Sequence, residues 1–388
     1  MMLNRNRMQS GSSEQCQWMA TETLSVPSKY FHACEKEILF FDNMFAVINN
    51  VTLQNSRNSN SKKGDFTLAL LYNSNHCKNQ VDLRGLHLKG SILSWMKTIQ
   101  PSNETIYNKT LSSQRIGFLA SRHDVNNLYH TMTLIYNIVV AKILLHVTHN
   151  ITVVIFVDTH QEKTILQELW ETLFQEVVHI KKATATLHFG TLIMVNSGYD
   201  GYLSHFQLPR LPFISEFTQF VANKFRICNN KKLNCSSINI LIILRQDGRN
   251  EDGSVKVTER KFYNERKLLS EIKKSLPAHR VRGVRLESFP IRTQFSFISQ
   301  TDFLVGMHGA GMTYALFLPE HAGVLELFNA NRDTGNLNYR TISKWRKLFY
   351  RAWQNYRVED EFPNFETRFH ARIIKYYFLE YIRFKCKN

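Results

Sequence analysis

The amino-acid sequence predicts an α/β fold in two domains. The chain has 388 residues, and a single hydrophobic core usually stops growing at about 250–300 residues, so the length favours two domains. Apolar runs typical of buried strands alternate with segments whose apolar residues recur every three or four positions, as in amphipathic helices. Strands that are apolar on both faces and alternate with helices indicate a parallel sheet covered by helices on both sides.

The first half of the chain shows this alternation in its central part. Residues 1–30 are polar with little periodicity, and we expect a disordered lead-in there. The apolar run at residues 152–158 predicts a buried strand, and residues 165–174 predict a helix. An earlier helix is predicted from the spacing of Leu128, Met132, Ile135, Val139 and Ile143. We assign residues 31–235 to an N-terminal α/β domain that is less regular than the second.

The second half repeats the alternation more regularly. The polar segment at residues 226–237 is the preferred boundary, and residues 236–388 form the predicted C-terminal domain. Strands are predicted at residues 238–245, 281–289, 302–307 and 323–328, and helices at residues 263–276, 293–300 and directly after residue 311. This order of elements is typical of a Rossmann-like domain.

The composition is that of a folded, basic protein. Hydrophobic residues make up 43% of the chain and aromatic residues 12%, which excludes a disordered protein. The net charge is +17, with Lys and Arg spread through the chain, which suits an anionic ligand such as a nucleotide diphosphate, a nucleic acid or an acidic membrane surface. The basic residues are not interleaved with aromatic ones, so we expect no nucleic-acid partner.

Cysteines and glycosylation sequons bear on the compartment. The six cysteines show no CxxC pair and no metal-ligand spacing, and their even number permits disulfides, with Cys228 and Cys235 in the closest spacing. Acceptor sequons for N-glycosylation occur at Asn50, Asn103, Asn108, Asn150 and Asn234. The first twenty residues lack the apolar region of a signal peptide, and no later run reaches the roughly 18–20 apolar residues of a membrane span. We therefore expect either a cytosolic protein or a natural leader that this chain lacks.

The stretch "VGMHGAGMTY" (residues 305–314) places a His and two glycines between an apolar strand and a helix-prone run. Backbone N–H groups of such a turn can point at an anion, and Gly309 and Gly311 leave room for its close approach, although turn geometry alone also explains glycines here. Arg245 follows another strand and could clamp a diphosphate, and Glu326, in a third strand, could accept hydrogen bonds from ribose hydroxyls. Ligands of parallel α/β sheets bind beyond the carboxyl ends of strands, so these groups together predict an anion site.

A second candidate group lies in "RHDVNNLYH" (residues 122–130), where Asp124, Asn127 and His130 surround a helix start. An Asn at this position is a natural helix N-cap, which is the structural explanation. In the functional alternative, His130 or Asp124 is a general base that faces the cleft between the domains. The sequence has no GxSxG, HExxH, kinase or Asp-x-Asp metal motif, which favours neutralisation of a diphosphate by Arg and helix termini without a metal ion.

The segment at residues 301–328, "TDFLVGMHGAGMTYALFLPEHAGVLELF", resembles the hallmark of glycosyltransferase family 61. The resemblance extends from about Arg122 to Tyr350. "NNLYHTMTLIYN" and "VVIFVDTHQEKTILQELWETLF" are most similar to the branch that adds core β-1,2-xylose to N-glycans. "LIILRQDGRNEDGSVKVTERKFYNE" is similar to the Arg-containing strand of the same branch and to its later Arg-x-x-x-Asn-Glu, here Arg260, Asn264 and Glu265.

The resemblance implies a GT-B-like fold, in which two Rossmann-type domains face a cleft and the C-terminal one binds the donor. It implies an inverting transfer of xylose from UDP-xylose to the core β-mannose of N-glycans, with no tightly bound cofactor and no metal requirement. A single displacement needs one base, for which Asp124 and His130 are the candidates on the acceptor side, together with Asn127. The donor side contains Arg245, Arg260, His308, Gly309, Ala310, Gly311 and Glu326.

Two departures from the family pattern leave alternatives open. The family reads close to HGAG-L-T-H at the turn, whereas this chain has Met312 and Tyr314, and an acidic residue usual near Leu134 or Ile135 is missing. One alternative is a transferase of N-acetylglucosamine from UDP-GlcNAc to secretory proteins such as EGF-like domains. Another is a UDP-sugar-binding pseudo-enzyme. The resemblance implies the Golgi or endoplasmic reticulum lumen, so we expect an upstream membrane anchor, since "YIRFKCKN" is not a KDEL-type signal.

Overall fold

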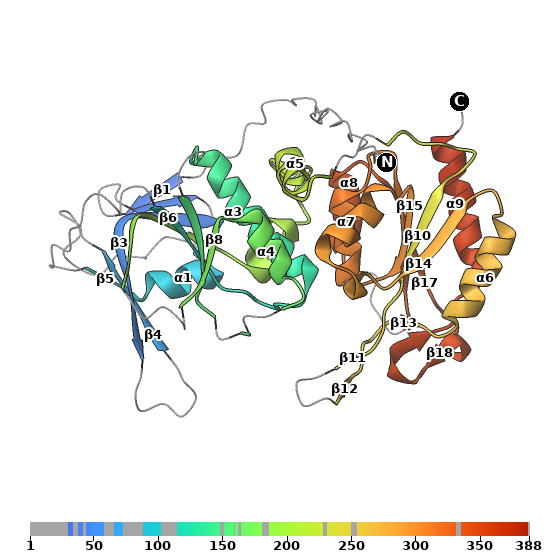
Figure 1. Cartoon of the computed structure of the whole chain (residues 1–388), viewed down its shortest axis with the longest axis horizontal. Coiled ribbons are helices and arrows are strands. Elements are labelled where there is room, and N and C mark those ends of the chain that lie inside the picture. Colours follow the sequence, from blue (N-terminus) through green and yellow to red (C-terminus); the bar gives the residue numbers. More distant parts are fainter. Residues whose placement is uncertain are drawn as a thin grey trace, which may run out of the picture.

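The computed structural model describes most of the chain between residues 30 and 386 (Figure 1). The described residues are 30–33, 38–41, 44–57, 66–72, 88–101, 115–147, 151–158, 160–161, 164–180, 186–227, 231–249, 254–330 and 335–386. Nearly all of the expected lead-in at residues 1–30 lies outside these ranges. So do the sequons at Asn103, Asn108 and Asn150 and the cysteines Cys16, Cys34, Cys77 and Cys228.

The first half of the chain forms a mixed nine-stranded sheet. Its main strand order is β1-β2-β3-β9-β6-β7-β8, with β4 paired to β3 and β5 to β4. The strands are β1 (Tyr30–Ala33), β2 (Ile38–Phe41), β3 (Phe45–Arg57), β4 (Phe66–Tyr72), β5 (Ile99–Pro101), β6 (Arg115–Ala120), β7 (Ile151–Phe156), β8 (Glu176–His179) and β9 (Leu187–Val195). Strands β9, β6, β7 and β8 are parallel to one another, whereas β1 to β4 form an antiparallel meander whose strand β3 also pairs antiparallel with β9. The Rossmann-type expectation for this half therefore fits only the β6–β9 part.

Helices cover both faces of this first sheet. Helix α1 (Gly90–Met96) packs on one face, and α3 (Leu128–Leu144), α4 (Gln167–Leu173) and α5 (Ile214–Phe225) pack on the other. The expectation of an amphipathic α3 is wrong, because every residue from Leu128 to Ala141 is buried. Its sequence has few polar side chains. Thr133 donates to the carbonyl of Tyr129 one turn earlier, and the amide nitrogen of Asn137 donates to the carbonyl of Asn196.

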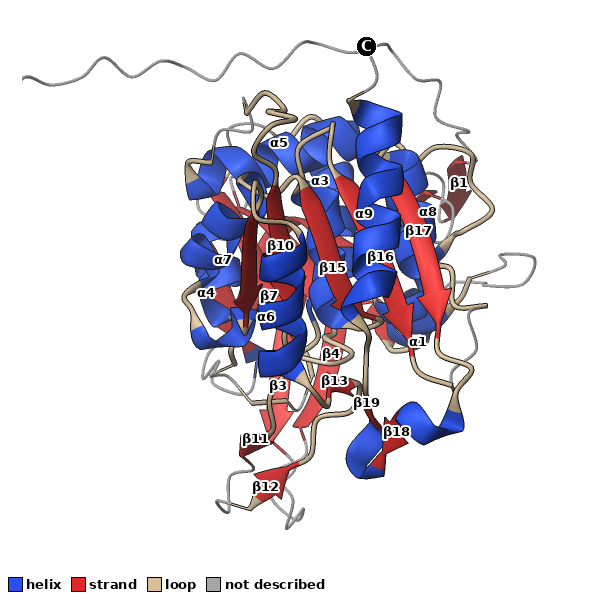
Figure 2. Cartoon of the chain, turned by 90° about the vertical axis from the view of Figure 1, so that its right-hand side faces the viewer, coloured by secondary structure: helices blue, strands red, loops and turns tan. Residues whose placement is uncertain are grey.

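The second half forms a five-stranded parallel sheet in the order β14-β10-β15-β16-β17. Its strands are β10 (Asn239–Ile243), β14 (Arg280–Val284), β15 (Phe303–Met307), β16 (Gly323–Phe328) and β17 (Phe349–Gln354). Helices α6 (Glu265–Ser275) and α9 (Ala371–Lys385) lie over one face (Figure 2). Helices α7 (Ile291–Ser299) and α8 (Asn338–Trp345) lie over the other, together with the 3-10 helix η5 (Ala310–Phe317). Short strands β11 (Gly248–Arg249), β12 (Val255–Lys256), β13 (Lys261–Phe262), β18 (Glu361–Phe362) and β19 (Glu366–Thr367) form two small sheets.

Two elements of the second half differ from expectation. The strand expected at residues 281–289 ends at Val284, because the chain turns there into a 3-10 helix at Leu286–Ser288. The helix expected after residue 311 is the tighter 3-10 form over its whole length.

One apolar core joins the two halves. It contains the inner helices α3, α4 and α5 of the first half together with α7, α8 and η5 of the second. Polar contacts also cross the junction: the backbone N–H of Ile291 donates to Glu168 Oε2 at 2.6 Å, and Trp345 Nε1 donates to the carbonyl of Leu208 at 3.0 Å. All strands of the first sheet precede residue 196 and those of the second follow residue 238, while the division into domains at residues 235 and 236 stays a prediction.

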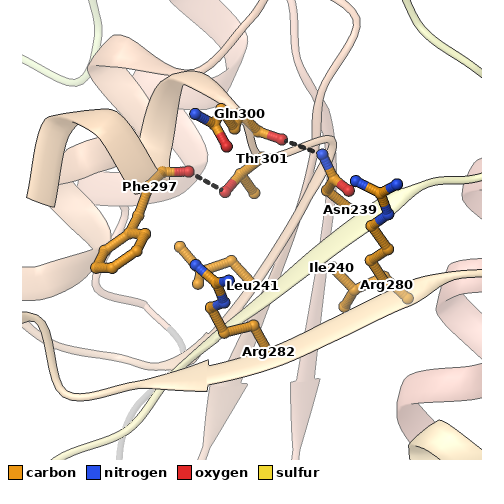
Figure 3. A pocket seen from close by; sticks show the side chains of 8 residues that line it. All are labelled: Asn239, Ile240, Leu241, Arg280, Arg282, Phe297, Gln300 and Thr301. Atoms are coloured by element: carbon orange, nitrogen blue, oxygen red, sulfur yellow. Dashed lines mark hydrogen bonds between the residues drawn. The ribbon is translucent and has the colours of Figure 1, made fainter. Parts of the chain in front are cut away.

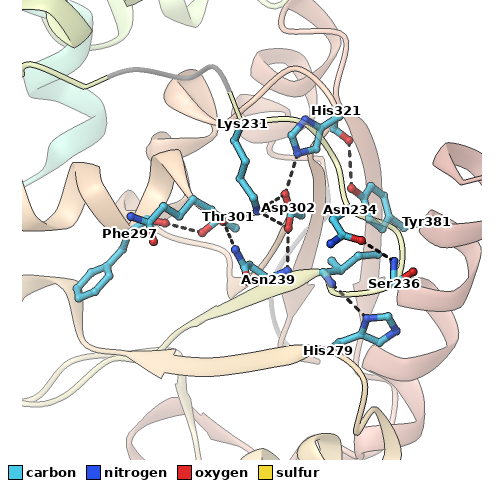
Figure 4. Close-up of polar contacts among 12 residues, drawn as sticks. Lys231, Asn234, Ser236, Asn239, His279, Phe297, Thr301, Asp302, His321 and Tyr381 are labelled. Atoms are coloured by element: carbon cyan, nitrogen blue, oxygen red, sulfur yellow. Dashed lines mark hydrogen bonds and ion pairs between the residues drawn. The ribbon is translucent and has the colours of Figure 1, made fainter. Parts of the chain in front are cut away.

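The amino edge of the second sheet is fixed by a buried carboxylate (Figure 4). Asp302 is fully buried and accepts from Lys231 Nζ at 2.5 Å, from the N–H of Asn239 at 2.8 Å and from His321 Nε2 at 2.8 Å. Burial raises the pKa of this carboxyl, but the bonds from His321, Asn239 and Lys231 outweigh it and leave the pKa below its ordinary value. Asp302 therefore tethers the segment before β10 to β15, at the edge opposite the predicted anion site.

A disulfide ties the last helix to the start of the second half. Cys235 pairs with Cys386 across a sequence separation of 151, so the close spacing of Cys228 and Cys235 did not identify the partner of Cys235. The bond joins the segment before β10 to the end of α9. Among the described residues there is no free cysteine.

We expect the C386S variant to lose about 2–5 kcal/mol of unfolding free energy, since it releases a crosslink over a long loop. Chemical denaturation of wild type and C386S, each with and without a thiol reductant, measures this effect. The reductant should destabilise the wild type and leave a C235S/C386S double variant unchanged. A wild type that is insensitive to reductant would contradict the pairing.

Candidate functional site

The predicted donor-side residues gather at the carboxyl edge of the second sheet. Strands β10, β15 and β16 are neighbours, and they end at Ile243, Met307 and Phe328. Arg245 and His308 directly follow the first two strands, so the parallel arrangement brings them to one edge. This is the edge at which α/β proteins bind their ligands.

His308 is held by a buried carboxylate and two aromatic rings. Its Nδ1 lies 2.5 Å from Glu326 Oε1, and its ring stacks on Phe328 with centroids 5.1 Å apart and tilts on Tyr339 at 5.2 Å. Its backbone N–H donates to the carbonyl of Leu327 at 2.8 Å. The imidazole therefore has a fixed orientation.

Glu326 is fully buried, and both of its carboxylate oxygens are engaged. Oε1 contacts His308, and Oε2 accepts from the Tyr350 hydroxyl at 2.6 Å. Hydrogen bonding of Glu326 to ribose hydroxyls stays a prediction. In the structure the carboxylate acts on the site through His308.

We expect the Y350F variant to lose about 1–3 kcal/mol of unfolding free energy, because it leaves a buried carboxylate oxygen without a donor. Urea denaturation of the wild type and the variant measures the difference. Y376F is the matched control, since Tyr376 is 60% exposed on α9. Equal losses in the two variants would contradict a stabilising Tyr350–Glu326 bond.

The glycine turn packs tightly against Arg245. A Cβ atom at Gly309 would lie 2.9 Å from the NH1 atom of Arg245, and one at Gly311 would lie 3.3 Å from Ile243 Cγ2. Ala310 and Gly311 are partly exposed and begin η5, whereas the rest of η5 is buried. The first N–H groups of a helix have no carbonyl partner within it, so the exposed start of η5 can receive an anion beside Arg245.

The two departures from the family wording at this turn face the core. Met312 is buried, and its Sδ occupies the space that a Cβ at Gly306 would fill. Tyr314 donates its hydroxyl to Gln294 Oε1 at 2.6 Å, and its ring meets that of Phe295 edge-on at 5.4 Å. Burial raises the pKa of Tyr314 far above its ordinary value, so it stays neutral. Both side chains fill the apolar core and leave the turn itself unobstructed.

A basic hollow of about 550 Å³ opens beside Arg245. Its walls come from the end of β10, from β13 and from the start of α6. Its basic lining residues are Arg245, Lys261, Arg266, Lys267 and Arg285, and its acidic ones are Asp247, Glu265 and Glu366. Lys261 pairs with Asp247 at 2.7 Å and with Glu366 at 3.0 Å, and Arg285 pairs with Glu265, so part of this charge is already neutralised. The excess of cations suits an anionic ligand.

Arg260 directly precedes β13, whose residues Lys261 and Phe262 line the hollow. Its backbone is left-handed, with φ 61°, and its N–H donates to the carbonyl of Phe365 at 3.0 Å. Burial raises the pKa of Tyr339, the nearby Glu326 adds to this effect, and the positive charge of Arg260 opposes it. Arg260 therefore lies near Tyr339, the ring that contacts His308.

The predicted acceptor-side residues lie at the start of α3, which follows the carboxyl end of β6. Asn127 is the N-cap, and its side chain accepts from the N–H of Tyr129 at 3.0 Å, as the structural explanation predicts. Asp124 is exposed, and its Oδ1 accepts from the N–H of Asn126 at 3.3 Å. The carboxylate of Asp124 thus remains open to solvent.

His130 is 7% exposed and lies against two other rings. The ring centroids of His123 and Tyr199 are 4.6 Å and 5.0 Å from that of His130. Burial lowers the pKa of His130, the neighbouring His123 lowers it further, and Asp124 opposes them. A neutral imidazole can accept a proton, which is what a general base requires.

A series of ring contacts connects the two groups of residues across the junction. His130 contacts Tyr129 at 5.7 Å, Tyr129 contacts Tyr339 at 6.1 Å, and Tyr339 contacts His308 at 5.2 Å between centroids. The carboxyl edges of the two sheets therefore meet at one place. The structure brings Asp124, Asn127 and His130 to the same region as Arg245, Arg260 and the turn at His308.

Several residues of this region have no recognisable signal in the sequence. Tyr199 and Tyr339 carry no motif and come from segments remote from both candidate groups. Arg122 and Asp158 form a buried ion pair that was not predicted, with Arg122 Nη2 2.7 Å from Asp158 Oδ1. Burial raises the pKa of Asp158, but the bonds from Arg122 outweigh it and leave the pKa below its ordinary value. This pair anchors the loop that carries His123 and Asp124. The sequence signal that could have identified the pair is Asp158, an acidic residue at the end of an apolar strand.

Another hollow lies at the opposite edge of the second sheet (Figure 3). It lies between the amino ends of β10 and β14 and the end of α7, and Arg280 and Arg282 line it together with Phe297 and Gln300. None of the predicted site residues contributes to it. No group of three or more His, Cys, Asp or Glu side chains in the described part of the chain is arranged to hold a metal ion. No helix in that part is long and apolar enough to span a bilayer.

An exposed helix start on a glycine turn at the carboxyl end of a parallel strand is an arrangement that often binds phosphorylated ligands. The family model of Glycosyltransferase 61 matches residues 128–325, just over half of the chain. The chain belongs to this glycosyltransferase family. The matched segment contains most residues of the two candidate groups. Asp124 and Asn127 precede it, and Glu326 directly follows it.

Individual relatives are similar at modest identity. The beta-1,2-xylosyltransferase RCN11 of Oryza sativa subsp. japonica is 23% identical over 302 residues, which cover 69% of this chain and 54% of that protein. The EGF domain-specific O-linked N-acetylglucosamine transferase of Drosophila melanogaster is 33% identical over 122 residues, 31% of this chain and 23% of that protein. The rat enzyme of the same name is 32% identical over 113 residues. The chain thus spans about half the length of the rice xylosyltransferase and about a quarter of the length of the fly transferase.

Proposed function

We propose that this protein is an inverting glycosyltransferase that transfers xylose from UDP-xylose to the core β-mannose of N-glycans in β-1,2 linkage. The observation that carries the proposal is the meeting of the two carboxyl edges, one with an anion-receptive turn and the other with a potential base. The similarity to the rice xylosyltransferase over 69% of the chain supports the donor sugar. The two facing sheets suit a GT-B-like arrangement with the donor in the second half.

On the donor side, Arg245 and the exposed start of η5 receive the diphosphate of the nucleotide sugar. An Arg guanidinium binds phosphate oxygens through two parallel N–H donors, and the helix start adds backbone N–H groups. Arg260 and the basic hollow supply further positive charge. These groups stabilise the charge that develops on the leaving UDP, so we propose that no metal ion is required.

On the acceptor side, a base accepts the proton of the attacking hydroxyl. The acceptor oxygen bonds to the anomeric carbon while the bond from that carbon to the diphosphate oxygen breaks, which inverts the configuration. His130 is our first candidate, because its pKa is lowered by burial and it lies next to the ring series that leads to His308. Asp124, exposed on the same loop, is the second.

The cellular setting follows from the proposed substrate. N-glycans are built in the lumen of the endoplasmic reticulum and Golgi, so we propose that the protein works there. The disulfide between Cys235 and Cys386 suits an oxidising compartment. Sequons at Asn50 and Asn234 are exposed and accessible to glycosylation.

The second candidate is transfer of N-acetylglucosamine to EGF-like domains. The identity of 33% to the fly enzyme favours it, although that match covers only 31% of this chain. A donor screen decides between the two: purified protein is incubated with UDP-xylose or UDP-GlcNAc, each with a trimannosyl core glycan and with a folded EGF domain. Xylose transfer to the glycan supports the first function. Transfer of GlcNAc alone, to the EGF domain, supports the second, and UDP binding without any transfer identifies a pseudo-enzyme.

A further inference from the structure

We infer that the exposed ring of Tyr199, with the imidazole of His123 edge-on beside it, forms a stacking platform for a pyranose ring of the acceptor, so that the acceptor is a saccharide and not a bare peptide hydroxyl. This inference rests on the proposed glycosyl transfer and names the substrate class of the acceptor side. The sequence motifs assign no role to either residue: Tyr199 lies outside them, and His123 lies within residues 122–130.

The first observation is that the ring of Tyr199 is exposed within a buried loop. Tyr199 is 62% exposed, whereas Tyr202 and Leu203 on the same loop are 7% and 0% exposed. Residue 199 lies in the 3-10 helix η2 (Gly198–Asp200), which follows the carboxyl end of β9. The chain thus presents one aromatic ring outward from an otherwise buried segment.

The second observation is that this loop is held rigidly on α3. A Cβ at Gly201 would lie 2.1 Å from Thr133 Cγ2, so only glycine permits this close approach. Gly198 has a left-handed φ of 61°, and a Cβ there would lie 3.3 Å from the ring of His123. The Tyr129 hydroxyl donates to the carbonyl of Leu203 at 3.0 Å. A ring on such a support needs no reordering to bind a ligand, which lowers the entropic cost of binding.

The third observation is the position of the ring. β9 and β6 are adjacent parallel strands, so Tyr199 after β9 and His123 after β6 meet at the same edge, with centroids 6.1 Å apart. Both rings contact His130, at 5.0 Å and 4.6 Å. The platform therefore adjoins the first base candidate, and His130 connects it through Tyr129 and Tyr339 to His308.

The chemistry of these rings selects a sugar. A pyranose presents an apolar C–H face that packs on an aromatic ring, and its hydroxyl rim needs polar partners. The exposed phenol hydroxyl and the exposed imidazole of His123 supply such partners beside the two rings. A serine or threonine acceptor on a protein offers no comparable flat face. The match of an exposed aromatic face with polar edges to a sugar ring is what supports a glycan acceptor.

The test uses Y199A, Y199F and the matched control Y376A, whose residue is equally exposed but lies on α9 over the far face of the second sheet. The free trimannosyl-chitobiose glycan is the probe. Its binding without donor is measured by ligand-observed NMR, and the KM values for glycan and UDP-xylose are measured separately. We expect Y199A to weaken glycan binding and raise the glycan KM about tenfold. The KM for UDP-xylose and the Y376A variant should stay near wild type. Y199F keeps the aromatic face and loses only the hydroxyl, so it should weaken glycan binding less than Y199A does.

The remaining outcomes would contradict either the Tyr199 platform or the proposed transferase activity. Wild-type binding and glycan KM in Y199A, or no glycan binding by the wild type, would overturn the platform. An equal rise of both KM values in Y199A would also overturn it, because it indicates a general loss of structure. Glycan binding that depends on Tyr199, without transfer from UDP-xylose or UDP-GlcNAc, leaves the platform standing and refutes the proposed transferase activity.

Discussion

Replacement of His130 by asparagine is expected to lower kcat about 10²- to 10⁴-fold, the usual contribution of a general base. Within the described residues the buried Nδ1 of His130 has no hydrogen-bond partner, so no neighbour fixes a proton on that nitrogen. Asparagine is similar in size and polarity but cannot accept the proton of the acceptor hydroxyl. The KM for UDP-xylose should change little, because the donor binds at the other edge.

The pH profile gives a second measure of the same prediction. The pKa of His130 lies below its ordinary value of 6.5, chiefly because of burial. Activity should therefore be full at neutral pH and fall as the pH drops through the lowered pKa, where the imidazole becomes protonated. His130 should also make the fold less stable below pH 6.5, since the unfolded chain takes up a proton there that the folded state resists. H130N should show neither of these His130-dependent changes.

D124N is the matched variant for choosing between the two base candidates. If His130 is the base, D124N should retain most of the turnover and the acid limb of the profile. The assignment to His130 fails if H130N keeps wild-type kcat while D124N loses it. Thermal unfolding of both variants shows whether a loss of turnover reflects a loss of structure.

Replacement of Arg245 by alanine is expected to lower kcat/KM for UDP-xylose about 10²- to 10³-fold, comparable to the removal of one preorganised donor to a developing charge. The guanidinium lies against Gly309 and beside the exposed start of η5, where the diphosphate is proposed to bind. Steady-state kinetics with varied donor measures the effect, and isothermal titration with UDP separates binding from chemistry.

R245K and R282A are the informative comparisons. Lysine keeps the charge but lacks the planar fork, so R245K should recover only part of the loss. Arg282 lines the hollow at the opposite edge, and R282A should leave donor kinetics unchanged. If R245A and R282A have the same kinetics, the donor site is not where we propose it.

Much of the second half could be predicted from sequence because its central strands β10, β15 and β16 are buried on both faces. β10 (Asn239–Ile243) and β16 (Gly323–Phe328) coincide with the predicted runs to within two residues. Such strands are uninterrupted apolar runs, which are the clearest local pattern. By contrast, the antiparallel part of the first sheet depends on pairing between β3 and β9, two segments more than a hundred residues apart, and no local pattern encodes such a pairing.

The candidate site was predictable where a strand ends in an unusual residue. His308 and Arg245 each follow an apolar run, so their common edge could be inferred from the parallel arrangement. The engagement of Glu326 by His308 and Tyr350 could not be inferred, because it depends on which way a side chain points inside β16. Tyr199 and Tyr339 could not be found either, since isolated tyrosines are common on protein surfaces and only the fold brings these two near histidines.

The burial of α3 from Leu128 to Ala141 has a consequence for how substrates enter. A helix without a solvent face cannot remain folded if the two halves separate, because separation exposes a wide apolar surface to water. The two sheets should therefore unfold in one cooperative step, and either half expressed alone should aggregate. Wide hinge opening between the sheets is disfavoured for the same reason. Selection of the sugar and of the acceptor then depends on the loops at the carboxyl edges of the two sheets. The sheets and their helices form a rigid scaffold, and substitutions in these loops can change specificity without changing the scaffold.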